Sequence, residues 1–175
     1  EEKQHQIMLA ENAKMQYTTI YKAKVNNTNF VGADLSGANF CGQGLMQVDF
    51  TNANLRGADL DRTNLSGAIL QNANVLEVNF SGANLSGVDF SNKDLKNSNL
   101  YGALLYKTNF TNADLSGADL RNIDLHQTIF SNVNFSNAYL AGVNFTNIDI
   151  DDLALKYANF EKNIPSLDLS GANFS

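Results

Sequence analysis

The stretch that decides the fold runs from Ala33 to Phe40 and reads ADLSGANF. In it, Ala, then Asp or Asn, then Leu or Phe recur at an interval of five residues. The interval continues in both directions, because every fifth residue from Ile20 to Phe160 is Ile, Val, Leu or Phe. The chain is therefore a repeat of the form A-[D/N]-[L/F]-x-[G/N], and this repeat is the first feature that a fold must satisfy.

A period of five fits neither an α-helix nor a flat strand. Five residues advance well past one turn of a helix and end on the opposite face of a strand, so either element would scatter the Leu and Phe side chains around the surface. The chain must turn once per repeat. Gly at the turn tolerates the unusual backbone angles, and Asn or Asp can bond locally to the backbone. Such repeats build coils that stack as a solenoid.

The number of repeats per coil is indicated by the phenylalanines. When the central positions are sorted at intervals of 20 residues, one column collects half of the Phe residues that occupy central positions. These are Phe30, Phe50, Phe90, Phe110 and Phe130. Four repeats per coil would stack aromatic rings on one another, which adds to the gain from burying them.

The uninterrupted units 33–37, 53–57 and 113–117 are similar to those of the pentapeptide-repeat family, and the resemblance covers about four fifths of the chain. It implies an all-β solenoid, a right-handed quadrilateral β-helix with four pentads per coil and about seven coils over residues 18–160. The central Leu or Phe, and the Ala two positions before it, would face inward.

Both ends depart from this pattern. Residues 1–17 hold apolar side chains among polar ones with no Gly or Pro, which predicts a short N-terminal cap helix. After Phe160 the frame slips, so residues 161–175 are expected to form a loop and a partial terminal coil. Because solenoid ends expose unpaired edges, the last coil must be capped, truncated or paired with another copy, and a homodimer through the C-terminal end is one expectation.

Composition argues for a non-enzymatic protein. Twelve Lys and Arg against 18 Asp and Glu give a net charge of -6, which disfavours direct nucleic-acid binding. No run of 18 apolar residues exists, so no transmembrane helix or membrane partner is expected. His5 and His126 lie far apart, and Cys41 has no basic residue within ten positions, so we predict no catalytic site, metal or cofactor.

The acidic residues mostly follow the repeat, since the slot before the central residue prefers Asp or Asn. Only Asp94 and Asp114 are one coil apart, and with Asp119 they form a candidate acidic surface. The resemblance adds an alternative function, because Qnr-type members of the family are DNA mimics that bind a type II topoisomerase. Those members carry loops within the repeats, whereas this chain has none between residues 20 and 160 and no continuous acidic stripe.

Some outward slots hold apolar instead of polar residues. Tyr101, Leu104, Tyr106 and, one coil on, His126 are expected to cluster near one corner. Exposed aromatic groups are typical anchors for a protein partner, so these four are candidate partner-binding residues. The sequence favours a structural or protein–protein interaction module presenting a smooth acidic rod, with a DNA-mimicking inhibitor or protector of gyrase as the alternative.

Lys93 is the sharpest exception to the repeat, because it occupies an inward Ala slot between Ala73 and Ala113. A buried unpaired ammonium is costly. We expect its side chain to reach outward, toward Asp94 or Asp114, or to distort the coil.

Overall fold

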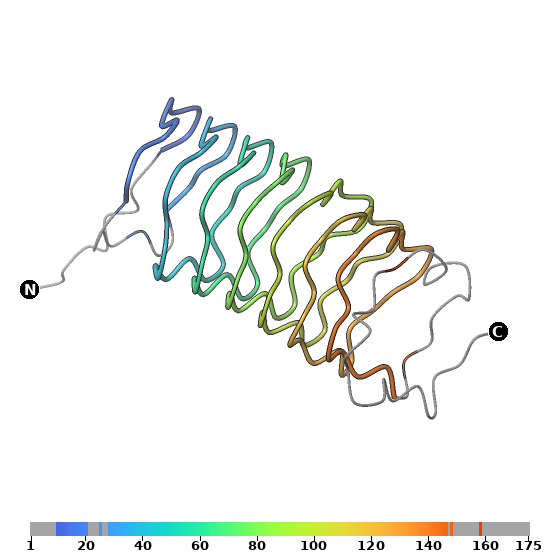
Figure 1. Ribbon diagram of the computed structural model, residues 1–175. Coiled ribbons are helices and arrows are strands. Elements are labelled where there is room, and N and C mark those ends of the chain that lie inside the picture. Colours follow the sequence, from blue (N-terminus) through green and yellow to red (C-terminus); the bar gives the residue numbers. More distant parts are fainter. Residues whose placement is uncertain (1–9, 21–24, 26–27, 147, 149–157, 159–175) are drawn as a thin grey trace, which may run out of the picture.

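A computed structural model describes residues 10–20, 25, 28–146, 148 and 158, which wind into a rod of stacked coils (Figure 1). Parallel bridges join residues that are 20 positions apart, such as Asn29 to Asp49 and Asp34 to Asn54. The regular structure consists of these single-residue bridges, and no helix or longer strand occurs among the described residues. The predicted quadrilateral β-helix with four pentads per coil is confirmed.

Each corner of a coil is a tight four-residue turn. The amide of Ala33 closes one such turn by donating to the carbonyl of Phe30 at 3.0 Å. The third residue, Gly32, has a φ of 67°, as type II turns require. In the slot before the turn, Asn29 accepts a hydrogen bond at Oδ1 from the amide of Val31 at 2.8 Å. The turn and this local bond explain why Gly or Asn, and Asp or Asn, recur in most pentads.

The core consists of the central residues and the small residues two positions before them. Phe30 stacks on Phe50 with ring centroids 5.4 Å apart and planes 5° apart. Phe90, Phe110 and Phe130 continue the column at the same spacing of 5.4 Å. The 20-residue register predicted from the phenylalanines is thereby confirmed.

The cap helix predicted over residues 1–17 is wrong in its described part. Residues 10–20 form further pentads, in which Lys14 bridges Asp34 and Thr19 bridges Asn39. Tyr17 takes a φ of 55°, as the third residue of a turn does elsewhere in the rod. Residues 10–20 follow the period of five because their backbone can then pair with the next coil. A helix would leave backbone groups of that coil without partners. Residues 1–9, and the loop and partial coil expected over 161–175, lie outside the described residues.

Candidate functional site

The predicted partner-binding residues lie along one side of the rod. Tyr101 and Tyr106 begin two successive turns, and Leu104 lies on the straight side between these corners. The exposed fraction is 41% for Tyr101, 58% for Leu104 and 48% for Tyr106. His126, also exposed, takes the position one coil beyond Tyr106. We call these four residues the tyrosine face. The expected single corner is wrong, because one pentad spans a whole side of the square.

Tyr101 is held in place by residues of the next coil. The guanidinium of Arg121 lies over the Tyr101 ring, 5.8 Å from its centroid, and 5.9 Å from that of Tyr139. Asn122 donates a hydrogen bond from Nδ2 to the Tyr101 hydroxyl at 2.5 Å. Asp119 in turn accepts from Arg121 Nε at 2.9 Å and from its terminal nitrogen at 2.7 Å. These contacts fix an aromatic side chain that is exposed to solvent. Neighbours along the sequence do not reveal these contacts, because the partners are one coil away.

The candidate acidic surface is partly neutralised. Asp94 and Asp114 bridge one another in adjacent coils, and Lys96 Nζ lies 3.2 Å from Asp94 Oδ2 and 3.4 Å from Asp114 Oδ2. Burial alone would raise the pKa of Asp114, but hydrogen bonds from Ser116 and the Lys96 ammonium outweigh it and lower the pKa. Asp119 lies on the neighbouring side with Arg121. The three carboxylates therefore do not form a bare acidic stripe.

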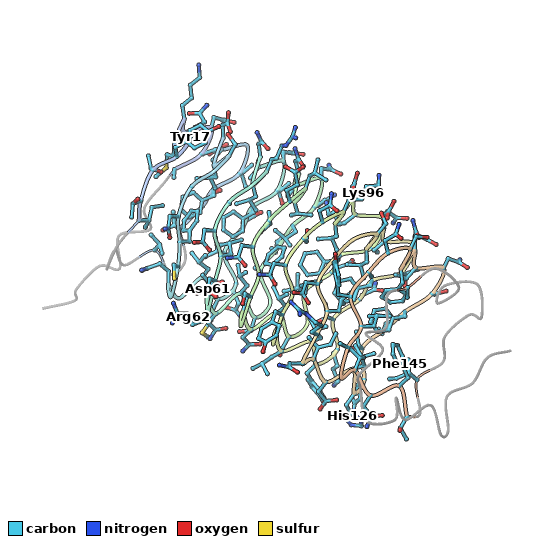
Figure 2. The ribbon with its side chains drawn as sticks, viewed as in Figure 1. Tyr17, Asp61, Arg62, Lys96, His126 and Phe145 are labelled. Atoms are coloured by element: carbon cyan, nitrogen blue, oxygen red, sulfur yellow. The ribbon has the colours of Figure 1, made fainter. Side chains whose placement is uncertain are left out.

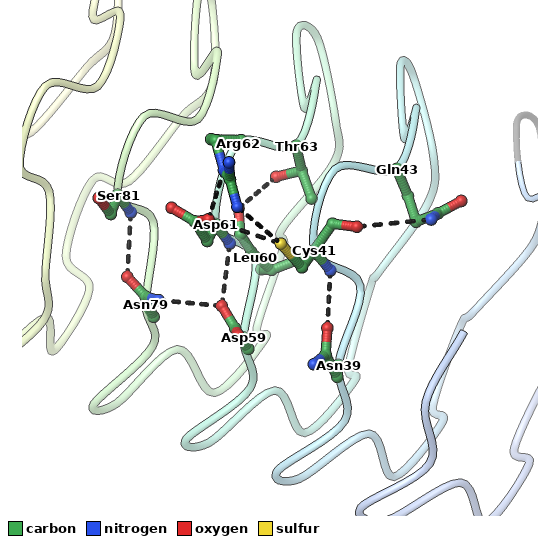
Figure 3. A network of polar contacts seen from close by, with 10 residues as sticks. All are labelled: Asn39, Cys41, Gln43, Asp59, Leu60, Asp61, Arg62, Thr63, Asn79 and Ser81. Atoms are coloured by element: carbon green, nitrogen blue, oxygen red, sulfur yellow. Dashed lines mark hydrogen bonds and ion pairs between the residues drawn. The ribbon is translucent and has the colours of Figure 1, made fainter. Parts of the chain in front are cut away.

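Cys41 lies in a polar cluster at a corner (Figure 3). Arg62, one coil on, places a terminal nitrogen 3.6 Å from Cys41 Sγ, and Asp61 Oδ2 is 3.5 Å from the same sulfur. Arg62 Nε also donates to Asp61 Oδ2 at 2.6 Å. The hydrogen bonds to Asp61 and Cys41 raise the pKa of Arg62. No basic residue lies within ten positions of Cys41 in the sequence, but the coil brings Arg62 next to it in space. Figure 2 shows Asp61, Arg62 and His126 along one edge of the rod and Lys96 along the opposite edge.

The ladder between coils is interrupted at one junction within the described residues. We call residues 68–77 the lower lip and residues 88–97 the upper lip of this open junction. No bridge joins Ile69 to Asp89 or Asn74 to Asp94, although bridges on the other two sides of the rod are intact, including Asn79 to Asn99. Figure 1 shows the green and yellow-green coils spread apart at their upper corners and regularly spaced at their lower corners. The junction is open on two sides only.

Lys93 lies in the open junction. Its Nζ donates to the carbonyl of Ala73 at 3.1 Å, which is the position that the amide of Asp94 would fill in a closed ladder. Burial lowers the pKa of Lys93, and the Asp89 carboxylate opposes this effect. The expectation that Lys93 distorts the coil is confirmed. The expected approach to Asp94 or Asp114 is wrong, because those carboxylates pair with Lys96 instead.

The open junction contains a solvent-open cavity of about 820 Å³. Both lips line it. The lining residues include Ile69, Leu70, Asn72, Asp89, Ser91 and Lys93. No feature of the sequence other than Lys93 signals this cavity.

Two further properties concern only the described residues. None of the described residues belongs to a helix that is long and apolar enough to cross a membrane. No group of His, Cys, Asp and Glu side chains there is arranged to hold a metal ion.

The chain matches the family descriptions "Pentapeptide repeat region" over residues 43–120 and "Pentapeptide repeats (8 copies)" over residues 11–42, 108–147 and 128–162. No curated protein matches the sequence. Among solved structures it is similar to HetL, a pentapeptide repeat protein involved in heterocyst differentiation regulation from the cyanobacterium Nostoc. The identity is 20%, the TM-score is 0.58, and the alignment covers 96% of this chain and 79% of HetL.

Two other solved structures are also similar. QnrB1, a plasmid-mediated fluoroquinolone resistance protein, is 19% identical with a TM-score of 0.43, over 89% of each chain. A pentapeptide repeat protein from the Arabidopsis thaliana thylakoid lumen is 30% identical with a TM-score of 0.27, over 80% of this chain and 87% of that one. From the repeat, the stacked coils and the matches over most of its length, the chain belongs to the pentapeptide-repeat family.

Proposed function

We propose that the protein is a non-enzymatic interaction module that binds a partner protein through the tyrosine face. The observation that carries the proposal is the exposure of Tyr101, Leu104 and Tyr106 on one side of the rod, in outward slots that the repeat mostly fills with polar residues. None of the three contributes to the core, and all expose apolar area. Large exposed aromatic side chains are frequent anchors of protein interfaces.

The surroundings of the tyrosine face suit such a role. Arg121 and Asn122 restrain Tyr101, and the ammonium of Lys107 lies 5.2 Å from the centroid of the Tyr106 ring. Anchors that are already ordered lose less conformational entropy on binding. The tyrosine rings and their cations together offer an apolar centre with a polar border, as interfaces commonly do.

The test replaces both anchors at once. Tyr101→Ser with Tyr106→Ser should leave the melting temperature nearly unchanged and weaken binding to a partner captured from the native host by about 1 kcal/mol or more. Ile129→Ser is the matched control, because Ile129 is 50% exposed on another side of the rod. Earlier melting of the double variant would make the tyrosines structural. Unchanged binding would place the interface elsewhere.

The alternative, a DNA-mimicking inhibitor or protector of gyrase, requires an extended negative surface. The net charge of -6 permits it, but Lys96 and Arg121 compensate Asp94, Asp114 and Asp119. We therefore expect neither inhibition of gyrase supercoiling nor protection from quinolones. Salt-sensitive activity that disappears when those three Asp residues are changed to Asn would favour the alternative.

A further inference from the structure

We propose that the open junction is a second binding site, which accepts an extended peptide strand of a partner protein between its two lips. The strand would pair through its backbone with both coils, as in other cases of β-strand addition. This proposal does not rest on the tyrosine face, which lies on a different side of the rod.

Both lips carry backbone groups that lack their usual partners. In the preceding coil, Phe50 N donates to Ile69 O at 2.8 Å and Asn52 N donates to Gln71 O at 2.9 Å. One coil on, the corresponding amides of Leu70 and Asn72 form no bond to the upper lip. The carbonyls of Asp89 and Ser91, which would accept those bonds, are likewise unpaired within the described chain. Backbone polar groups of this kind are almost always satisfied by some partner.

The arrangement of these groups selects an extended peptide. The lower lip presents amides at alternate residues, Leu70 and Asn72, and the upper lip presents carbonyls at alternate residues, Asp89 and Ser91. A strand offers the N–H and C=O groups of alternate residues to each of its neighbours, so its carbonyls can accept from the amides of the lower lip while its amides donate to the carbonyls of the upper lip. A small anion would leave the carbonyls of Asp89 and Ser91 without donors. The cavity of about 820 Å³ is also in the usual range of ligand sites.

The junction is built so that it stays open without dividing the rod. The Lys93 ammonium donates a hydrogen bond to the Ala73 carbonyl. Because the Asp94 amide therefore cannot bond to this carbonyl, the lips cannot close on that side. The bridges Asn64 to Asn84 and Asn79 to Asn99 hold the two opposite sides together. The two lips can therefore move apart while these bridged sides stay together and act as a hinge.

The first experiment uses the full chain and a blocked hexapeptide with the sequence of residues 112–117, NADLSG. Amide hydrogen exchange at Leu70 and Asn72 should slow by about tenfold or more at saturating peptide. The same peptide carrying N-methyl groups on alternate residues keeps its side chains and loses backbone donors, so it should have no effect. No slowing by the unmodified peptide, or equal slowing by the methylated one, would overturn the proposal. Slowing by inorganic phosphate in place of the peptide would overturn it as well.

The second experiment removes the Lys93 side chain, which holds the lips apart. Lys93→Ala should close the ladder and abolish the peptide effect, whereas Lys96→Ala, at an outward lysine of the same lip, should retain it. Peptide binding that persists in folded Lys93→Ala would contradict the proposal. The comparison of the two peptides on the parent protein decides the question even if Lys93→Ala does not fold. The double Tyr→Ser variant should bind the peptide normally, which separates this site from the proposed function.

Discussion

Two neighbouring junctions of the rod share one repeat pattern and differ in their pairing. Between residues 88–97 and 108–117 the ladder is closed, with Phe90 N bonded to Asn109 O at 2.8 Å and Asn92 N bonded to Thr111 O at 2.9 Å. Between residues 68–77 and 88–97 it is open on two sides. At the equivalent inward position, the second coil of the closed junction has Ala113, whereas the second coil of the open junction has Lys93.

The difference shows how local the stability of a solenoid is. One inward ammonium opens two sides of one junction, yet the next coil stacks normally, because each coil contacts only its neighbours. The stacked rings of Phe90 and Phe110, 5.4 Å apart, continue directly beside the defect. Core packing and ladder pairing can therefore be perturbed separately.

The largest effect is expected in the closed region. Phe110, fully buried in the aromatic column, should lose about 3 to 5 kcal/mol of unfolding free energy on Phe110→Ala, because a large cavity forms between two stacked rings. Chemical denaturation measures this loss. The outward Thr111→Ala should change stability by less than about 0.5 kcal/mol. Similar losses at both positions would contradict the assignment of inward and outward slots.

A gain is expected at the open junction. Lys93→Ala should raise the unfolding free energy by about 2 kcal/mol, since it removes a half-buried ammonium and allows several ladder hydrogen bonds to form. The reciprocal change Ala113→Lys should open the closed junction and destabilise it by a similar amount. Chemical denaturation of both variants measures these two changes in unfolding free energy. If Lys93→Ala is destabilising, Lys93 supports the coil instead of opening it.

A smaller effect is expected at the corners, where a departure from the repeat leaves the ladder intact. Gln47 has a φ of 55°, yet its amide still donates to Ser66 O at 3.1 Å. Gln47→Gly should gain about 0.5 kcal/mol, because Gly adopts positive φ without steric cost. Asn52→Gly, at a φ of 60°, should change little, since Asn tolerates this region. Thermal melting of the two variants distinguishes them, and an equal response would argue against strain at Gln47.

The smallest effect concerns pH. Burial would raise the pKa of Asp119, but hydrogen bonds and the charge of Arg121 outweigh it and hold the pKa below its ordinary 3.8. A carboxyl with a lowered folded-state pKa stabilises the fold above 3.8, and the contribution disappears as the pH falls through the folded value. Asp119→Asn should therefore lose less stability on acidification than the parent protein. A denaturation series from neutral pH into this acid range measures the difference, and an identical acid response would exclude Asp119 as a contributor.

The sequence predicts the regular parts of the molecule well, because the period of five states which side chains face inward and the Phe column states the coil length. The cap helix over residues 1–17 is wrong in its described part because apolar residues there also continue the period of five: Ala10 and Met15 lie two and one repeats before Ile20. The repeat marks Lys93 as an exception, but the direction of its side chain depends on which carbonyl lies one coil away.

The contacts of the candidate sites were harder to predict for the same reason. Arg62 reaches Cys41 and Arg121 reaches Tyr101 across about 20 residues. These pairs follow from the register once it is known, but only side-chain geometry shows that they meet. The open junction depends on how backbone yields around a misplaced ammonium, which no periodicity describes.

The most direct test of the account is native-state hydrogen exchange at the two junctions of the unliganded protein. The amides of Leu70 and Asn72 should exchange at least about tenfold faster than those of Phe90 and Asn92, because only the latter pair are bonded to the next coil. In Lys93→Ala the four amides should become similarly protected. Equal protection of the four amides in the parent protein would show that the ladder is closed at Lys93 and would contradict the account.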